Sequence, residues 1–152
     1  MANNYLDLCG IEFTEFSSQE PEALHKLFLA FGFSRLMRHK EKKIDLYQQN
    51  DIVFLLNYEA TTFGHDFYKA HGPCVSSMGW RVKDSKKAYE VALERGAVAS
   101  SKIDYSIGEA EIPTIMGIGD SNIYLMDNFS DGDRYAKMGF EKLENPDLVD
   151  AL

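Results

Sequence analysis

Four histidines, side chains that commonly bind transition metals, are the first candidates for chemistry in this chain. They are His25, His39, His65 and His71. Non-haem iron(II) sites commonly use two histidines and one carboxylate that converge on one point. None of the four lies in an alternating strand beside a second ligand, and His65 and His71 are too far apart for the i, i+4 spacing of one helix face. We therefore predict ordinary surface histidines rather than a metal site.

Carboxylates in or beside predicted strands are the second candidate group, because a strand carboxylate facing a concave sheet can act as a general base. Residues 11–16 alternate between apolar and polar side chains, which predicts a strand that buries Ile11 and Phe13 and turns Glu12 the other way. The alternation favours half-exposed strands with a solvated acidic face. We expect that face to carry four glutamates: Glu12, Glu15, Glu109 and Glu111.

Other motifs carry weaker signals. Residues 116–120 contain Gly117 and Gly119 but no lysine and no following helix, so a turn between strands is favoured over a phosphate-binding loop. Cys74 has no histidine fixed beside it by the sequence, which leaves a nucleophilic role unsupported. The basic run at residues 40–43 is typical of a solvated hairpin tip, and Trp80 is expected in the core.

Charge and composition restrict the partners and the location. The chain has 152 residues and a formal net charge of -8, which argues against nucleic acid and anionic membranes, since both require a basic face. No stretch approaches the roughly 20 apolar residues of a membrane span, and no signal-peptide pattern is evident. The two cysteines, Cys9 and Cys74, indicate free thiols in a reducing compartment. We expect a soluble, cytoplasmic protein.

The elements that would position these side chains follow a repeated order. After the strand at 11–16, serines and Pro21 predict the start of a helix that ends at Gly32. Three strands are expected next, at residues 33–38, 44–48 and 52–57, and a second helix at 62–70.

The same order then begins again. A strand at 76–82 precedes a helix capped by Asp84 and ended by Gly96, and extended segments follow at 97–100, 110–115 and 122–126. This pattern predicts two tandem βαβββ modules, at about 9–60 and 74–128, which share one core within a single domain at 9–128. Residues 1–8 are expected to be an extension, and the polar residues 129–152 a tail or linker.

Several segments occur together in the order and spacing of a known family. They are GIEFTEF at 10–16, LYQQNDI at 46–52, LLN at 55–57, AHGP at 70–73, WRVKDSKKAY at 80–89, IPTIMGIG at 112–119 and YL at 124–125. Through these segments the chain resembles the N-terminal half of the 4-hydroxyphenylpyruvate dioxygenases, in their bacterial form. The resemblance covers nearly the whole chain.

The resemblance implies an α+β, vicinal-oxygen-chelate (glyoxalase-like) fold of paired βαβββ modules with a mixed curved sheet. Members of the family are oxidoreductases that use iron(II) and dioxygen to convert 4-hydroxyphenylpyruvate to homogentisate in tyrosine catabolism. Their iron ligands, two histidines and one glutamate, belong to the C-terminal half, so no catalytic, cofactor-binding or metal residue is assigned to this chain. The corresponding strand positions hold Glu12, Ser77 and either Met126 or Asp127, a poor donor set for iron.

Two hypotheses about function stay open at this point. In the first, the chain is a non-catalytic domain whose partner is the family's C-terminal catalytic domain, expected to begin near Leu152, and whose uncovered apolar face forms a homo-oligomer. In the second, it is a free-standing binding or interaction module with a metal-free cleft. The candidates to line that cleft are Phe13, Tyr47, Asn57 and Trp80. A metal site shared across a homodimer is disfavoured by the histidine pattern.

Overall fold

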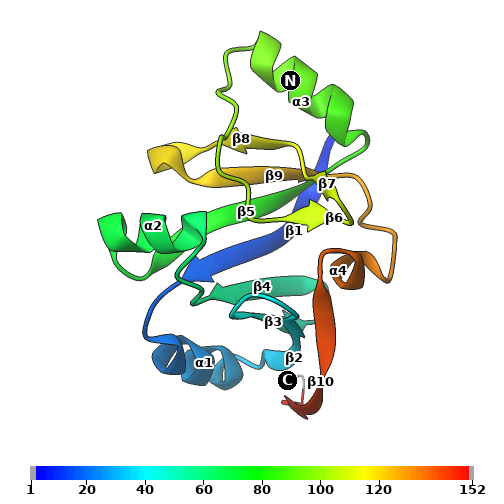
Figure 1. Cartoon of the computed structure of the whole chain (residues 1–152). Helices are drawn as coiled ribbons and strands as arrows, with labels where there is room; N and C mark the ends of the chain where they lie inside the picture. The colour runs from blue at the N-terminus through cyan, green and yellow to red at the C-terminus, as the bar shows by residue number, and fades with distance from the viewer. Residues whose placement is uncertain (1–2, 151–152) are drawn as a thin grey trace.

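One eight-stranded sheet organises the molecule in a computed structural model (Figure 1). The structure describes residues 3–150, so residues 1–2 and 151–152, the outer ends of the predicted extension and tail, lie outside the described residues. The first module and the connecting helix comprise β1 (Leu8–Ser17), α1 (Pro21–Ala30), β2 (Ser34–His39), β3 (Ile44–Gln49), β4 (Ile52–Asn57) and α2 (Phe63–His71). The rest of the chain forms β5 (Cys74–Val82), α3 (Ser85–Glu94), β6 (Ser106–Ile107), β7 (Ala110–Glu111), β8 (Thr114–Met116), the 3-10 turn η1 (Ile118–Asp120), β9 (Asn122–Met126), α4 (Arg134–Lys137) and β10 (Phe140–Asp147).

The sheet has the strand order β10-β2-β3-β4-β1-β5-β9-β8. Within each module the first strand runs parallel to the last, β1 to β4 and β5 to β9, and the antiparallel pairing of β1 with β5 joins the two modules. The predicted tandem βαβββ arrangement and the α+β fold are therefore confirmed. The second module is the less regular of the two, because the counterpart of β2 is reduced to one bridge between Ala99 and Ile115.

The helix ends follow the local signals of the sequence. Gly32 and Gly96 adopt φ values of 90° and 97° after α1 and α3, a conformation that favours glycine. The carboxylate of Asp84 accepts a bond from the Lys87 amide at 2.9 Å and so caps α3. The serine cap expected for α1 is absent: Glu20 is the N-cap residue and makes no side-chain cap bond, although its amide donates to Ser18 Oγ at 3.0 Å.

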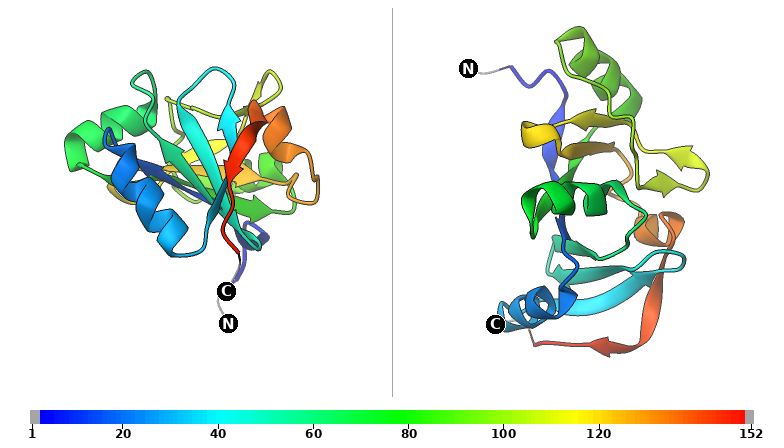
Figure 2. Two further views of the ribbon diagram at one scale, coloured as in Figure 1. Left: turned by 90° about the horizontal axis from the view of Figure 1, so that it is seen from below. Right: turned by 60° about the vertical axis from the view of Figure 1, so that its left-hand side comes forward.

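The sheet has two faces with different coverings. On the outer face, α1 covers the first module through Phe28 and α3 covers the second through Ala88, and Figure 2 shows these helices at opposite ends of the sheet. Trp80 lies partly buried in the α3 cluster, in agreement with the predicted core position. The inner face is defined here by four fully buried side chains from four strands: Phe13, Leu46, Leu55 and Tyr124.

The C-terminal segment through β10 is part of this domain, which corrects the prediction that residues 129–152 form a tail or linker. β10 pairs antiparallel with β2 at the edge of the sheet, and α4 precedes it. Tyr135, Met138 and Phe140 are buried in the inner-face core. The polar composition conceals this strand because an edge strand contacts the core with few side chains. A function of the segment as a connection to a further domain stays a prediction.

A small hairpin also departs from the expected elements. The single extended segment predicted at 110–115 is divided into β7, which pairs with β6, and β8, which joins the main sheet. This division places Tyr105 and Ile112 in the inner-face core. No helix among residues 3–150 is long and apolar enough to cross a membrane.

Truncation of Phe140 tests whether the C-terminal segment stabilises the fold. Phe140 is 1% exposed, so we expect Phe140→Ala to lower the free energy of unfolding by about 3–5 kcal/mol, measured by urea denaturation. The control Leu148→Ala removes a side chain that is 71% exposed and should change stability by no more than about 0.5 kcal/mol. Equal, small effects of both substitutions would contradict the position of β10 in the core.

Candidate functional site

Two of the four histidines are structural side chains rather than surface ones. His25 Nδ1 lies 2.7 Å from the Tyr47 hydroxyl. His39 Nδ1 accepts from the amides of Glu41 and Lys42 at 3.2 Å each, so its Nε2 carries the proton that is donated to the Met138 carbonyl at 3.1 Å. Burial, followed by the charge of Lys42, lowers the pKa of His39, in agreement with this neutral form.

The other two histidines lie on α2, where His71 is exposed and its ring packs in a tilted orientation against Phe67, with ring centres 4.2 Å apart. Among residues 3–150, no group of three histidine, cysteine or acidic side chains is arranged to hold a metal ion. The four histidines thus lie on three elements, α1, β2 and α2.

The prediction of a solvated acidic face is wrong for Glu12 and Glu15, which are 1% and 0% exposed. Irregularities in the pairing of β1 with β5, between Ile11 and Phe13 and again after Glu15, shift the alternation of side chains. As a result Glu12 and Phe13 are both buried, and Ile11, which was expected in the core, is 56% exposed. Glu109 and Glu111 are exposed, as expected.

Glu12 joins three parts of the chain. Its carboxylate accepts from Arg81 Nε of β5 at 2.6 Å, from Arg134 Nε of α4, and from the Tyr135 hydroxyl at 3.0 Å. Two guanidinium groups therefore compensate one buried carboxylate, and their attraction offsets the desolvation cost of its charge. Through two guanidinium groups and one hydroxyl, the Glu12 carboxylate links β1, β5 and α4.

Glu15 lies in a buried cluster of neutral donors. Its carboxylate accepts from Ser77 Oγ at 2.6 Å, from Asn57 Nδ2 at 3.0 Å, from Ser76 Oγ at 3.2 Å and from the Tyr105 hydroxyl. No cation contacts it among the described residues. Burial, and then the negative charge of Asp104, raises the pKa of the Glu15 carboxyl, while the hydrogen bonds act in the opposite direction.

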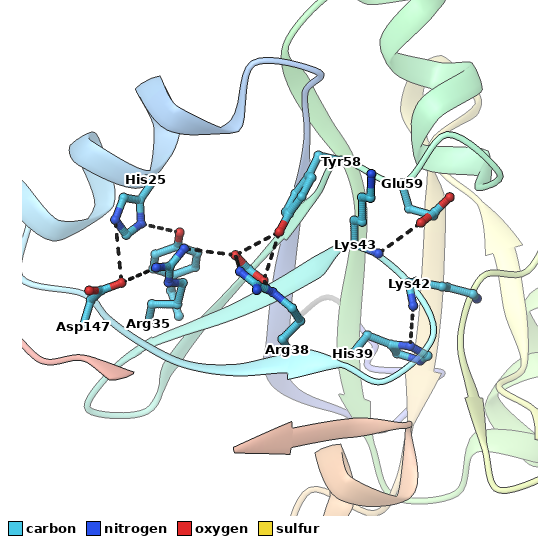
Figure 3. A network of polar contacts seen from close by, with 11 residues as sticks. His25, Arg35, Arg38, His39, Lys42, Lys43, Tyr58, Glu59 and Asp147 are labelled. Carbon is cyan, nitrogen blue, oxygen red and sulfur yellow. Dashed lines mark hydrogen bonds and ion pairs between the residues drawn. The ribbon is translucent and has the colours of Figure 1, made fainter. Parts of the chain in front are cut away.

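A third polar network lies on the outer face beside α1 (Figure 3). Asp45 is buried and accepts from Arg38 through two bonds, of 2.6 and 3.1 Å, and from Arg35 at 3.4 Å. Arg35 also forms an ion pair with Asp147 of β10, and His25 Nε2 lies 3.8 Å from the same carboxylate. This network fastens the end of β10 to β2 and α1.

The strand positions that the resemblance matches to iron ligands hold side chains that are engaged in other contacts. Glu12 is bound by two arginines, Ser77 donates to Glu15, and Met126 is buried in the core. Asp127, the alternative to Met126, accepts from the Ser85 amide at 2.9 Å at the start of α3. This donor set does not fit iron(II), since it offers one compensated carboxylate, a hydroxyl and a thioether.

The remaining motifs have structural positions. The glycine stretch at 116–120 forms the turn between β8 and β9, where Ile118 is 96% exposed. Cys9 and Cys74 are free thiols, and burial, followed by the charge of Glu15, raises the pKa of Cys74, which opposes thiolate formation. In the basic turn between β2 and β3, Lys42 Nζ donates to the Asp104 carbonyl at 2.6 Å.

The predicted cleft residues do not line a common cleft. Phe13 is in the inner-face core, Asn57 is bound to Glu15, and Tyr47 and Trp80 belong to separate outer-face clusters. Tyr105, Tyr124 and Tyr135 are buried over the inner face and occupy much of it. A cavity of about 650 Å³ lies at the β10–β2 edge of the inner face, beside β2, β3, α4 and β10, and no sequence signal indicated it.

Two βαβββ modules that share one curved mixed sheet define an α+β protein of the vicinal-oxygen-chelate class. The chain belongs, within that class, to the family described as "Hydroxyphenylpyruvate dioxygenase, HPPD, N-terminal", whose model matches residues 2–141.

Relatives agree with this family. Protein MelA of Shewanella colwelliana is 48% identical over 143 residues, which cover 94% of this chain and 40% of MelA. A 4-hydroxyphenylpyruvate dioxygenase of Pseudomonas sp. strain P.J. 874 is 39% identical over 144 residues, 95% of this chain and 40% of that enzyme. A solved fusion protein of a xylose isomerase-like TIM barrel and 4-hydroxyphenylpyruvate dioxygenase superposes with a TM-score of 0.77 at 29% identity, over 98% of this chain and 23% of the fusion protein. The chain thus spans about 40% of the length of the two curated relatives.

The raised pKa of Glu15 predicts a specific pH dependence of stability. The folded state keeps the Glu15 proton to higher pH than the unfolded state, whose carboxyl titrates near 4.5, so its contribution is complete below that pH and is lost as the pH rises through the folded-state value. Urea unfolding of wild type and Glu15→Gln between pH 5 and 8 should show wild type losing stability relative to the variant, with a slope of up to about 1.4 kcal/mol per pH unit.

Glu109→Gln is the matched control, because Glu109 is exposed on the hairpin turn. We expect this variant to follow the wild-type pH profile. A pH-independent difference between wild type and Glu15→Gln would show that the carboxyl titrates alike in both states.

Proposed function

We propose that this chain is the non-catalytic N-terminal domain of a 4-hydroxyphenylpyruvate dioxygenase-like protein and that iron(II) is held by a second, C-terminal domain. The observation that carries the proposal is the use of the inner face for structure. Glu12 is neutralised by two arginines, Ser77 is bound to Glu15, and Met126 is buried in an aromatic core. An iron(II) site requires open coordination positions, and these side chains provide none.

The activity of the whole protein is part of the proposal. Family membership and the 40% span of two relatives, one of which is named a 4-hydroxyphenylpyruvate dioxygenase, support a longer protein that contains a catalytic domain. The reaction would be the iron(II)- and dioxygen-dependent conversion of 4-hydroxyphenylpyruvate to homogentisate in tyrosine catabolism. A bacterial, cytoplasmic setting is supported by the bacterial sources of both relatives and by the free thiols Cys9 and Cys74.

Iron titration and oxygen uptake test whether this chain lacks the iron site and the activity that we assign to a C-terminal domain. The purified 152-residue chain, loaded anaerobically with iron(II), should bind substoichiometric iron and show no oxygen uptake that depends on 4-hydroxyphenylpyruvate. The Pseudomonas dioxygenase serves as the positive control. Stoichiometric iron together with substrate-dependent oxygen uptake by the chain alone would overturn the proposal.

The proposed partner can be tested separately. Co-expression of the chain with the C-terminal portion of the Pseudomonas dioxygenase should yield a complex that co-purifies, because the two portions correspond to successive parts of one relative. The same C-terminal portion expressed with an unrelated domain of similar size is the control. Separate elution of the two portions would argue against a catalytic partner of this kind.

We also propose that the chain self-associates through exposed apolar side chains at one end of the first module. Phe31 and Ile52 are 66% and 52% exposed, and Gln49, which pairs with Ile52, donates to the Phe31 carbonyl at 3.2 Å, so the two side chains lie at the same end of the sheet. Exposed apolar groups that lie together commonly mark an interface.

Sedimentation velocity over a range of concentrations should show a monomer–oligomer equilibrium for wild type. The double variant Phe31→Ser/Ile52→Ser should shift it to monomer, whereas Val98→Ser, at an exposed position near the opposite edge of the sheet, should not. A wild-type monomer at every concentration would contradict self-association.

A further inference from the structure

A cavity of about 650 Å³ on the inner side of β2 and β3 is unused by the proposed function. Its size falls within the range of roughly 300–1,000 Å³ that is typical of small-molecule sites. Its lining includes six apolar residues from β2, β3, α4 and β10, of which Leu36, Leu143 and Pro146 are partly exposed: Leu36, Leu46, Tyr135, Phe140, Leu143 and Pro146.

The cavity arises from unequal lengths of two paired strands. Lys142 of β10 pairs with Met37 of β2, and the next pair joins Asp147 to Arg35. Residues 143–146 of β10 therefore face the single residue Leu36, and the longer segment stands away from β2. Leu143 and Pro146 of that segment line the cavity. The space is thus a consequence of backbone geometry rather than of a single missing side chain.

Both strands are fixed beyond this gap. Asp147 forms an ion pair with Arg35, and its Oδ2 lies 3.8 Å from His25 Nε2. Figure 3 shows these three side chains facing one another. Ser34 Oγ accepts from the Val149 amide at 2.8 Å and donates to the Val149 carbonyl at 3.3 Å. Because these contacts hold the segment in place, the cavity is formed without a ligand, and binding there costs little ordering of the chain.

The charged side chains around the cavity favour an anion. Lys40, Arg134 and Lys142 line it together with two carboxylates, Asp133 and Glu141, which leaves one net positive charge in a chain whose net charge is -8. Among the described residues, neither Lys40 nor Lys142 is in an ion pair. Arg134 and Arg81 share the single carboxylate of Glu12. The set of these three side chains therefore also has one excess positive charge.

We propose that this cavity binds a small organic anion with an aliphatic or aromatic body and one carboxylate or sulfonate group. The body lies against the partly exposed side chains Leu36, Leu143 and Pro146. The anionic group lies near Lys40, Lys142 or Arg134. The proposal goes beyond the non-catalytic function of the domain.

Two related dyes test both parts of the proposal at low ionic strength. The probe is 1-anilinonaphthalene-8-sulfonate, and N-phenyl-1-naphthylamine is its uncharged counterpart. We expect saturable binding of one sulfonate dye per chain, measured by fluorescence, and weaker binding of the uncharged dye. Circular dichroism at each dye concentration should show the native spectrum, so that binding reports the folded chain.

Charge reversal tests the cationic side chains. Lys40→Glu/Lys142→Glu should weaken sulfonate binding about threefold to tenfold. The matched control Lys26→Glu/Lys69→Glu makes the same change of net charge on exposed residues of α1 and α2 and should leave the affinity unchanged. Equal affinities of the cavity variant and its control would overturn the anion preference, as would equal binding of the two dyes by wild type.

Filling the cavity tests its location. Leu36→Trp should abolish binding of both dyes, and Gln48→Trp, which enlarges a second lining residue on β3, provides an independent variant if the first does not fold. Leu148→Trp adds the same ring at a residue outside the cavity lining and should bind as wild type. Wild-type affinity in a folded cavity-filling variant would place the dye elsewhere and overturn the proposal.

Discussion

The buried carboxylate of Glu12 connects the parts on which the rest of this structure depends. It comes from the first module, accepts one bond from Arg81 of the second module, and accepts two more from the segment that carries Arg134 and Tyr135. Removal of one partner from such a buried group commonly costs about 3–5 kcal/mol, because the remaining charge loses its compensation. This side chain therefore reinforces the β1–β5 pairing of the modules and anchors α4, which precedes the buried Phe140.

The same placement explains why the inner face is largely filled by buried side chains. Tyr105 belongs to the segment before the β6–β7 hairpin, and Tyr135 belongs to α4. Both segments lie outside the βαβββ pattern, and both tyrosines pack into the inner-face core. The polar side chains that stay there, such as Glu15 and Ser77, bond to one another rather than to solvent. Buried polar groups with complete hydrogen bonding rigidify a core, and that is what this face contributes.

Local signals in the sequence were sufficient for the repeated fold. Glycines after α1 and α3 and the Asp84 cap mark the helices, and the element order between them repeats, so the tandem modules are predictable. Side-chain burial was less predictable, because the irregular pairing after Ile11 breaks the alternation of buried and exposed side chains. In addition, the partners of Glu12 are distant in the sequence, and Arg134 is 122 residues away. The cavity could not be foreseen either, since it depends on how β10 separates from β2.

The double compensation of Glu12 also limits what engineering could restore on this face. A metal ion bound by that carboxylate would have to displace Arg81 and Arg134 and leave two partly buried cations without their shared partner. Addition of a histidine nearby would leave this obstacle in place. A new metal site would require replacement of both arginines together with the addition of a metal-binding side chain. Variants with only some of these changes would contain a buried charge without its partner and would not yet bind a metal.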